Sequence, residues 1–369
     1  MKLAILGTRG IPANYGGFET FAEELSVRLA QRGHEVTVYG RSHFIDAALD
    51  GRQYRGVHVR LLPTIQHKYL DTVAHTFISC IDCWWRHYDA VLICNAANSP
   101  FAFIPRLTGC RVLLNVDGIE RKRKKWNALA RAYYRVGEWL ATKLPNAIVS
   151  DAAVIEQYYL ETYGAPSVMI PYGSDFEPAS GTDVLERFGL SPGQYVLYVS
   201  RLEPENNADV VIQAFRPLDT TMHLLVVGDA PYATGYKQRL RALAGDDPRI
   251  IFTSYVFGDG YRQLQSHAAC YLQATEVGGT HPALLEAMGA GNCIIANATP
   301  ENREVVGDAA LLYRFNDTDD LRTQLGRVLA DPALRAHYGQ RARDRAHDRY
   351  SWERVTDQYE ALFRQLIRG

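Results

Sequence analysis

Short apolar runs alternate along the chain with segments in which apolar residues recur every three or four positions. The runs are typical of buried strands and the segments of amphipathic helices, such as Phe18–Arg32 and Asn207–Phe215. Expected strands in the first half are Lys2–Leu6, Glu35–Tyr39, Val57–Leu61, Ala90–Cys94, Arg111–Asn115, Ala147–Val149 and Val168–Ile170. Those in the second half are Tyr195–Val199, His223–Val227, Ile250–Thr253, Ala269–Gln273, Cys293–Ala296 and Ala310–Tyr313. Such alternation predicts parallel sheets with helices on both faces.

The series of strands restarts near Pro171–Asp175, and a looser connection with proline and glycine follows over residues 177–194. We therefore predict an α/β fold with two doubly wound, Rossmann-like domains, residues 1–172 and 173–350. Because such sheets bind ligands beyond the carboxyl ends of their strands, we expect the ligand in a cleft between the domains. Residues 351–369 carry an apolar stripe and are expected to form an amphipathic helix.

Composition narrows the functional class. The chain has 369 residues, 47% hydrophobic and 22% charged, with a net charge of −1, which gives no case for nucleic acid as a partner. The charge is divided: residues 1–172 hold 20 Lys and Arg against 15 Asp and Glu, and the remainder holds 20 against 26. No apolar run is long enough to span a bilayer, and residues 1–7 are too short for a signal peptide, so we expect a cytoplasmic protein.

The six cysteines are expected to be structural. Only Cys80 and Cys83 are close in sequence, and no second pair or histidine cluster completes a zinc site. Two other features are also expected to have structural roles. Asp317–Asp320 resembles a metal-binding acid cluster but is expected to be a helix-capping turn, and Trp84-Trp85 is expected to lie in the core.

The segment Glu276–Gly289 contains two carboxylates on either side of a glycine turn. An apolar strand precedes the turn, and an apolar helix containing Glu286 follows it. Backbone N–H groups and the positive end of the helix dipole then form an anion site, while Glu286 can accept hydrogen bonds from sugar hydroxyls. These features predict a nucleotide-sugar site. The alternative for Glu286 is an ordinary solvated helix residue.

A second glycine-rich loop, Gly7–Glu19, joins the first strand to the first helix. Gly16 and Gly17 directly precede the helix, where their N–H groups can approach an anion. The nicotinamide fingerprint G-x-G-x-x-G is absent. A loop after the first strand of this architecture usually binds ligand; the alternative is a turn that merely needs glycine.

Arg201 follows the first expected strand of the second domain, and its planar guanidinium suits a diphosphate. The alternative is an exposed surface arginine. Asp117 ends a strand of the first domain. After it come five consecutive basic residues and an aromatic: Arg121, Lys122, Arg123, Lys124, Lys125 and Trp126. This run is either a solvated helix start or a basic shelf for an anionic acceptor or a membrane surface.

Taken together, these residues resemble the family 4 retaining glycosyltransferases, which have the two-domain GT-B fold, over essentially the whole chain. The points of resemblance are the Gly16-Gly17 loop with Glu19, Gly33–Val38, Ile170–Asp175, Arg201, Glu286–Met288, Glu304–Asp308 and Ser351-Trp352. A bacterial branch of this family, labelled rhamnosyltransferase, has sequences similar to those of Gly7–Glu19, Pro204–Asn207 and Val277–Pro282.

The resemblance implies a role for each site residue. Arg201 and the Gly279-Thr280 turn would hold the donor diphosphate, and Glu286 the ribose hydroxyls. The backbone around Tyr255 and Val256 would face the base. Glu276 and the turn after it, with Gly278 and His281, would contact the donor sugar. The last helix, residues 351–369, would cross back to the first domain.

Three departures from the family pattern stand out. Asn206 occupies the position of the usual lysine, so one positive charge on the leaving diphosphate is missing. Part of its effect would have to come from backbone N–H groups or from a lysine or arginine elsewhere. Nine residues separate Glu276 from Glu286, where the family usually has seven. Either the loop bulges here, or Glu276 is not the counterpart of the family's first glutamate. Asp117 stands where a histidine is usual, and its expected role is acceptor orientation.

The predicted activity is therefore transfer of a sugar from a nucleoside diphosphate to an acceptor hydroxyl with retention, without a metal or other cofactor. The expected acceptor is a carbohydrate, in particular a lipid-linked saccharide of cell-surface polysaccharide synthesis at the inner membrane face. Two alternatives are a nucleotide-sugar epimerase or hydrolase on the same architecture, and a non-catalytic nucleotide-sugar sensor.

Overall fold

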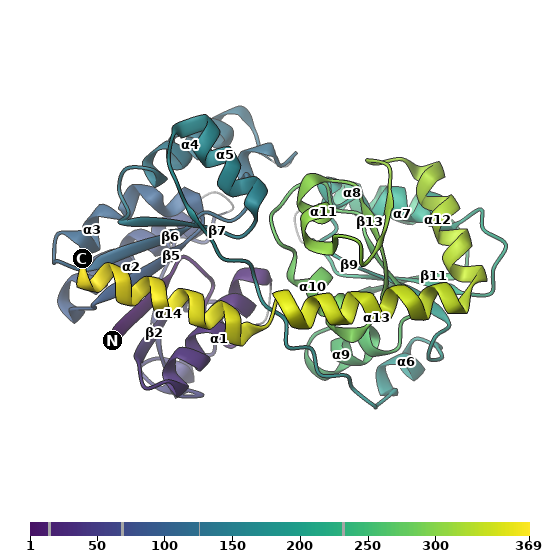
Figure 1. Ribbon diagram of the computed structural model, residues 1–369, viewed down its shortest axis with the longest axis horizontal. Helices are drawn as coiled ribbons and strands as arrows, with labels where there is room; N and C mark the ends of the chain where they lie inside the picture. The colour runs from purple at the N-terminus through teal and green to yellow at the C-terminus, as the bar shows by residue number, and fades with distance from the viewer. Residues whose placement is uncertain (14–15, 68–69, 125, 231–232) are drawn as a thin grey trace. The chain divides into compact units, whose positions relative to one another are not determined.

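A computed structural model describes residues 1–13, 16–67, 70–124, 126–230 and 233–369. The chain divides into two units (Figure 1). The first comprises residues 1–122, 126–173 and 352–369, and the second comprises residues 123–125 and 174–351.

The first unit is built on an eight-stranded sheet with the order β3-β4-β2-β1-β5-β6-β7-β8. All neighbouring strands are parallel except β3 and β4. The strands are β1 (Lys2–Leu6), β2 (Glu35–Arg41), β3 (Gln53–Tyr54), β4 (Val57–Leu62), β5 (Ala90–Cys94), β6 (Arg111–Asn115), β7 (Ala147–Ser150) and β8 (Val168–Met169). Every residue of the central strand β5 is buried, as expected for a parallel strand covered on both faces.

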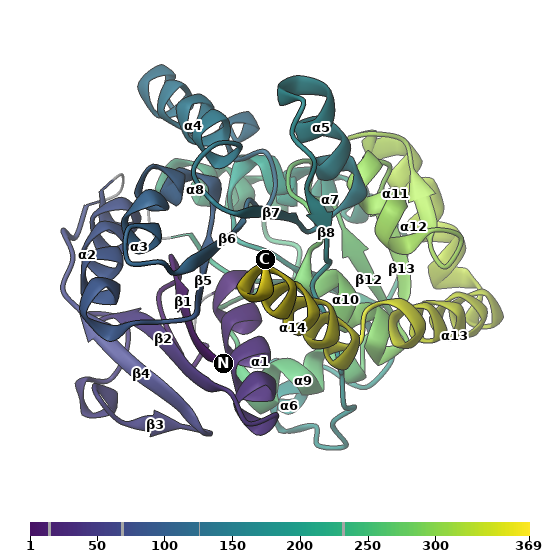
Figure 2. The same ribbon diagram turned by 60° about the vertical axis from the view of Figure 1, so that its left-hand side comes forward.

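Helices cover both faces of this sheet (Figure 2). They are α1 (Gly17–Gln31), α2 (Asp71–Arg86), α3 (Phe103–Arg106), α4 (Ala128–Ala141), α5 (Ala153–Tyr163) and α14 (Trp352–Arg368), with short 3₁₀ turns η1 (Ala47–Leu49), η2 (Ala96–Phe101) and η3 (Glu120–Lys122). The crossover through α1 runs toward β2, whereas those through α2 to α5 run toward β8. Because such crossovers are right-handed, α2 to α5 lie on the face opposite α1.

The last helix, α14, packs against α1 within the first unit. Its Tyr359 is fully buried, and the Tyr359 hydroxyl accepts a hydrogen bond from Asn115 Nδ2 at 2.9 Å. Arg32 at the end of α1 forms ion pairs with Asp357 at 2.7 Å and Glu360 at 2.9 Å. Residues far apart in sequence therefore complete one core.

The second unit contains a six-stranded, fully parallel sheet with the order β11-β10-β9-β12-β13-β14. Its strands are β9 (Tyr195–Val199), β10 (His223–Val227), β11 (Ile250–Ser254), β12 (Cys270–Gln273), β13 (Cys293–Asn297) and β14 (Leu311–Tyr313). Its helices are α6 (Asp183–Arg187), η4 (Pro204–Asn206), α7 (Ala208–Phe215), α8 (Thr234–Ala244), α9 (Gly258–Ser266), α10 (Pro282–Ala290), α11 (Pro300–Val306), α12 (Thr318–Ala330) and α13 (Pro332–Arg349).

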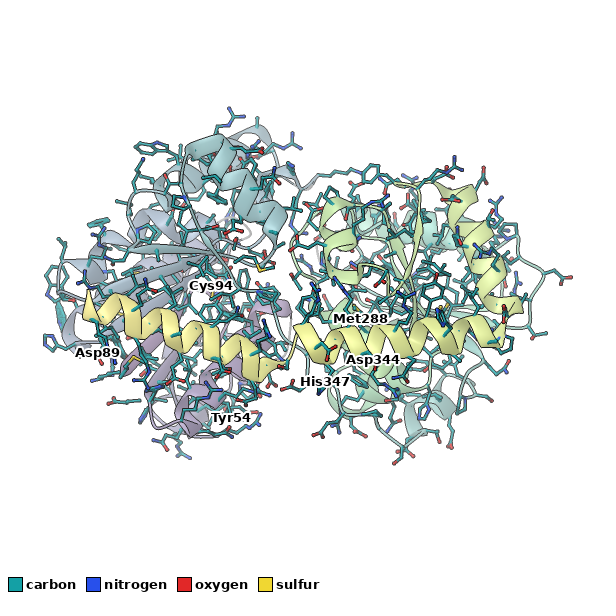
Figure 3. All side chains as sticks on the ribbon, in the orientation of Figure 1. Tyr54, Asp89, Cys94, Met288, Asp344 and His347 are labelled. Carbon is teal, nitrogen blue, oxygen red and sulfur yellow. The ribbon has the colours of Figure 1, made fainter. Side chains whose placement is uncertain are left out.

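The predicted fold class is confirmed: both sheets are doubly wound, and each expected strand is present to within two residues at its ends. The pattern missed the two-residue antiparallel strand β3, which is too short and too polar to give a signal. All six cysteines are free and buried, as expected; Figure 3 shows Cys94 among the strands of the first unit.

One expectation about the core is wrong. Trp84 and Trp85 on α2 were expected inside, but their exposed fractions are 41% and 67%. The face of α2 that meets the sheet instead carries smaller side chains, among them Ser79, Cys80 and Cys83. The sequence has apolar residues on both faces of this helix, and its periodicity alone did not separate them.

Candidate functional site

The carboxyl ends of β9 and β12 lie side by side in the middle of the second sheet, with Leu272 paired to Tyr198. The strand order reverses between these two strands, which is where doubly wound sheets bind ligands. The chain leaves β9 into the loop containing Arg201, and it leaves β12 into the Glu276 segment. The two segments with the strongest predicted chemistry therefore meet at the switch point of one sheet.

The loop after β9 is held by backbone and side-chain hydrogen bonds. The carbonyl of Arg201 accepts a hydrogen bond of 2.7 Å from Asn206 Nδ2, and the Asn206 carbonyl accepts one of 2.7 Å from the Tyr198 hydroxyl. Gly228 has a φ of +127°, and a Cβ there would lie 1.9 Å from the Ser200 oxygen, so only glycine lets this loop pass. The buried Asn206 amide thus fixes the backbone of Arg201.

The predicted glycine turn lies directly before α10. Residues 278–280 are buried, and Gly278 has a φ of +156°. A Cβ on Gly278 would lie 2.4 Å from Cε1 of His281, so the imidazole packs directly against the turn. Burial, together with the positive charges of Arg123 and Arg201, lowers the pKa of His281 to about 3. The imidazole is therefore neutral near pH 7, and the turn precedes the helix N-terminus as the sequence predicted.

Glu286 lies in the second turn of α10 and is partly exposed. Its Oε2 accepts a hydrogen bond of 2.6 Å from the hydroxyl of Tyr261, which in turn accepts one of 2.8 Å from Gln265 Nε2. Burial and the Glu286 charge raise the pKa of Tyr261 well above its usual value, so it remains a donor. The carboxylate is therefore oriented by a phenol rather than free to rotate in solvent.

Glu276 is held by a network of asparagines. Its Oε2 accepts a hydrogen bond of 2.6 Å from Asn316 Nδ2, and its Oε1 lies 2.6 Å from Lys124 Nζ. Asn316 Oδ1 accepts hydrogen bonds from Asn207 at 2.8 Å and Asn297 at 2.7 Å. Only 8% of the Glu276 side chain is exposed, so its orientation is set by these partners.

Sequence reasoning missed these asparagines and one further acid. Asn207 follows β9, Asn297 ends β13 and Asn316 follows β14. Their common position at the carboxyl edge of the second sheet was the signal available in the sequence. Glu205 is fully buried, and neither carboxylate oxygen has a hydrogen-bond partner among the described residues. The guanidinium of Arg123 lies nearby, with Nη1 3.9 Å from Oε1 of Glu205.

The region predicted to face a nucleotide base lies after β11. The Tyr255 ring stacks on Phe257 with a centroid distance of 5.6 Å, and the Tyr255 hydroxyl donates to the Asp229 carbonyl at 3.1 Å. Val256 between them is partly exposed. These residues lie at the same carboxyl edge of the second sheet as Arg201.

In the first unit, Gly16 is the N-cap of α1, which begins at Gly17. The buried Glu19 accepts a hydrogen bond of 2.9 Å from the Arg9 backbone N–H, and its Oε2 lies 3.4 Å from where a Gly16 Cβ would be. A carboxylate of the protein itself therefore lies next to Gly16, in the loop that the sequence suggested for an external anion.

Asp117 follows β6 in a left-handed conformation, with a φ of 57°. Its backbone N–H donates to Asn115 Oδ1 at 2.9 Å, and its Oδ1 accepts a hydrogen bond of 3.2 Å from the Tyr172 hydroxyl. Asp117 is thus anchored to the end of its own strand and to the segment that closes the first unit.

The basic run does not form one exposed shelf. Arg121 donates to Glu138 at 3.0 Å and to the Tyr158 hydroxyl at 2.6 Å, and Arg123 is buried. Lys122 and Lys124 are exposed, and the Trp126 ring packs on Tyr134 with a centroid distance of 5.3 Å. Lys125 lies outside the described residues. The basic shelf is wrong for Arg121, whose guanidinium binds Glu138, and for Arg123, which is buried with Nη1 3.9 Å from Oε1 of Glu205.

The acidic segment Asp317–Asp320 lies at the start of α12. Asp317 caps α12, since its Oδ1 accepts hydrogen bonds of 3.0 Å from the N–H groups of Asp319 and Asp320, which confirms the capping turn. In the described part of the chain, no group of three or more His, Cys, Asp or Glu residues could hold a metal ion. Nor is any helix there long and apolar enough to cross a bilayer.

Comparison with known proteins gives a family for part of the chain. Residues 193–331 match the family described as glycosyl transferases group 1, and residues 92–175 match a domain of unknown function. A phosphatidyl-myo-inositol mannosyltransferase of Mycolicibacterium smegmatis is 31% identical over 57% of this chain and 54% of its own. The N-acetyl-alpha-D-glucosaminyl L-malate synthase of Bacillus anthracis is 27% identical over 51% of this chain and 50% of its own. The chain thus spans about half the length of these curated relatives.

Similarity to solved structures extends over the whole chain. The Anabaena protein HepE, solved in complex with UDP and glucose, has a TM-score of 0.82 at 17% identity, with 99% of this chain and 100% of that chain covered. At this identity the likeness establishes the fold, and that fold is the GT-B arrangement of two Rossmann-like sheets. Residues 193–331 thus match the group 1 glycosyltransferase family, and the chain as a whole has the GT-B fold.

Proposed function

We propose that the protein is a retaining glycosyltransferase that moves a sugar from a nucleoside-diphosphate sugar to an acceptor hydroxyl. One observation carries this proposal: Arg201, the Gly278–Thr280 turn and the carboxylates of Glu276 and Glu286 gather at the switch point of the second sheet. An anion site beside two oriented carboxylates matches the two halves of a nucleotide sugar.

In the proposed reaction, charge builds on the departing diphosphate as the glycosidic bond breaks. Arg201 and the N–H groups at the start of α10 would stabilise that charge, in place of a metal ion. His281, neutral because of its lowered pKa, adds no charge but can accept or donate one hydrogen bond at the turn. Asn206 would act through Arg201, since its side chain binds that residue's carbonyl.

The two acids have different proposed partners. Glu286, oriented by Tyr261, would accept hydrogen bonds from the ribose hydroxyls, and the backbone of Tyr255 and Val256 would lie beside the base. Glu276, oriented by Asn316, would hold hydroxyls of the donor sugar. Asp117 of the first unit is proposed to orient the acceptor.

The acceptor is proposed to be a lipid-linked saccharide of cell-surface polysaccharide synthesis. The support is in the relatives' names, which include the phosphatidyl-myo-inositol enzyme and an O-antigen chain mannosyltransferase of Escherichia coli. The amino-acid sequence of Gly7–Glu19, which resembles the rhamnosyltransferase branch, supports a rhamnosyl donor as one specificity to be tested.

A donor panel tests the proposal. Wild-type protein is incubated with GDP-mannose, UDP-glucose and dTDP-rhamnose, and release of nucleoside diphosphate is followed with and without a saccharide acceptor. We expect release that depends on acceptor, and an α-linked product from an α-linked donor. Release that is independent of acceptor would identify a hydrolase, and binding without turnover would identify a sensor; either result would contradict the proposal.

A further inference from the structure

Arg123 is a buried cation in a short segment that has left its neighbours in the chain. Residues 123–125 belong to the second unit, whereas the chain on both sides of them belongs to the first. Only 7% of Arg123 is exposed, so its guanidinium is largely removed from water. A buried charge is costly unless other groups compensate for it. The position of Arg123 therefore needs an explanation beyond solubility.

The carboxylate of Glu205 lies close to this guanidinium but does not close on it. Nη1 of Arg123 lies 3.9 Å from Oε1 of Glu205. Glu205 is fully buried, and neither of its carboxylate oxygens has a hydrogen-bond partner among the described residues. A buried ion pair that serves stability needs good hydrogen-bond geometry, with N···O distances of about 2.7–2.9 Å. The open pair is instead the arrangement expected of a cation that is shared with a second anion.

Glu205 also connects Arg123 to the two segments of the proposed donor site. Its backbone carbonyl accepts a hydrogen bond of 3.0 Å from the N–H of Glu276, so the loop after β9 and the segment after β12 are joined at this residue. Lys124, next to Arg123 in the chain, has Nζ 2.6 Å from Oε1 of Glu276. The pair Arg123-Lys124 thus places one cation beside an acid of each segment.

The glycine turn before α10 is under the influence of both arginines. The positive charges of Arg123 and Arg201, together with burial, lower the pKa of His281 to about 3. The His281 imidazole itself packs against Gly278 of the turn. Two guanidiniums therefore act on the place where the N-terminus of a nine-residue helix already favours an anion.

The two segments of the site hold more acid than base. Residues 200–207 contain Arg201 and two glutamates, and residues 276–286 contain two glutamates and no lysine or arginine. With the His281 imidazole neutral, one guanidinium accompanies four carboxylates before any ligand binds. A diphosphate adds negative charge, and like charges repel strongly in a site removed from water. A cation from outside these segments is therefore needed, and Arg123 lies beside both of them.

We propose that Arg123 binds the diphosphate of the donor together with Arg201 and so supplies a second guanidinium to the site. A planar guanidinium can contact two phosphate oxygens at once, and its attraction for them is stronger where water is excluded. The inference rests on the proposed function, because the diphosphate is that of the nucleotide-sugar donor. It adds to that function a binding residue from a distant part of the sequence.

Titration calorimetry with inorganic pyrophosphate tests Arg123 without reference to the base or the sugar. A panel of UDP, GDP and dTDP then identifies the nucleoside diphosphate that the wild-type protein prefers. Arg123→Gln should weaken the binding of pyrophosphate and of that nucleotide about ten- to a hundredfold, as expected for the loss of charged hydrogen bonds. Arg123→Lys keeps the charge without the planar fork and should recover part of the affinity. The affinity for the corresponding free nucleoside should stay unchanged.

Arg121→Gln is the matched control. Arg121 belongs to the same basic run, but its guanidinium binds Glu138 at 3.0 Å, so this variant should leave pyrophosphate affinity unchanged. Thermal unfolding of each variant reports on folding, because Arg123→Gln leaves a buried acid without its cation. If Arg123→Gln is unstable, Glu205→Gln is compared with Arg123→Gln/Glu205→Gln, where no such acid remains and the same loss of affinity is expected.

The outcomes separate this inference from the proposed function. Wild-type affinity for pyrophosphate in a folded Arg123→Gln protein would overturn the inference, as would an equal loss in Arg121→Gln. If Arg123→Gln binds as the wild type does while the wild type transfers sugar, only the inference fails. If Arg123→Gln loses affinity but the wild type transfers no sugar to any acceptor, only the proposed function fails. A wild-type protein that binds neither pyrophosphate nor a nucleoside diphosphate would contradict both.

Discussion

Replacing Asn316 with glycine should lower donor turnover while leaving the fold intact. Asn316 donates to Glu276 Oε2 at 2.6 Å, and Glu276 is nearly buried, so little water is available to replace the lost donor. A hydrogen bond to a charged group contributes about 1.5–3 kcal/mol. If that contribution is realised in the transition state, kcat/KM falls about ten- to a hundredfold.

Glycine is the appropriate replacement because Asn316 has a φ of 54°, which glycine adopts without strain. Arg55→Gly is the matched control, since Arg55 also has a positive φ of 49° but lies in the first unit. Asn316→Asp keeps the shape of the side chain but places a carboxylate against that of Glu276, so this variant should lower kcat/KM at least as much as Asn316→Gly.

The assay measures release of nucleoside diphosphate at varied donor concentration, with calorimetry of the free nucleoside diphosphate alongside. Because Glu276 is proposed to contact the sugar, Asn316→Gly should reduce kcat/KM and leave the affinity for the nucleoside diphosphate unchanged. Wild-type kcat/KM in a stably folded Asn316→Gly protein would refute the reasoning, as would an equal loss in Arg55→Gly.

Four further predictions concern single groups. Arg201→Ala should reduce turnover by a hundredfold or more, corresponding to about 3–4 kcal/mol of lost transition-state stabilisation, with an unchanged melting temperature; near-normal turnover would remove Arg201 from the mechanism. Glu286→Ala should weaken nucleotide binding by about ten- to a hundredfold in calorimetry, and unaltered affinity would argue against a ribose contact. Chelation with EDTA should leave the initial rate unchanged, whereas recovery of a lost rate by added Mg²⁺ would show that a metal is required. Because the folded pKa of His281 is about 3 and its usual value is about 6.5, the unfolded chain binds more protons between these values, so stability should fall as pH drops through this window. Denaturant titrations of wild type and His281→Gln should therefore diverge from neutral pH to pH 4, and parallel curves would contradict the assignment.

The strands could be predicted from sequence because parallel strands buried on both faces are simple apolar runs, as in β5. Arg201 and the Glu276 segment were found by the same logic, since each follows such a run at a sheet's carboxyl edge. Which face of each helix is buried was harder to predict. Trp84 and Trp85 lie on an amphipathic helix whose inner side is made of small residues, so hydrophobicity pointed to the wrong side.

The partners of the site residues could not be predicted from local sequence. Asn316 is 40 residues from Glu276, and its contact depends on the order in which β12, β13 and β14 are laid side by side. The fate of the basic run depends on similarly distant acids, such as Glu138, 17 residues beyond Arg121. A pattern identifies chemical groups along the chain, whereas long-range pairing decides which of them remain available.

The position of α14 has a consequence for how the protein is made. Residues 352–369 belong to the first unit, yet the ribosome produces them only after the whole of the second. Until they emerge, the pocket that Tyr359 and Phe363 fill stays open, and Asn115 lacks its phenolic partner. The first unit to be synthesised is thus the last to be finished, so that a nascent chain or a fragment cut near residue 350 exposes apolar surface to chaperones and proteases.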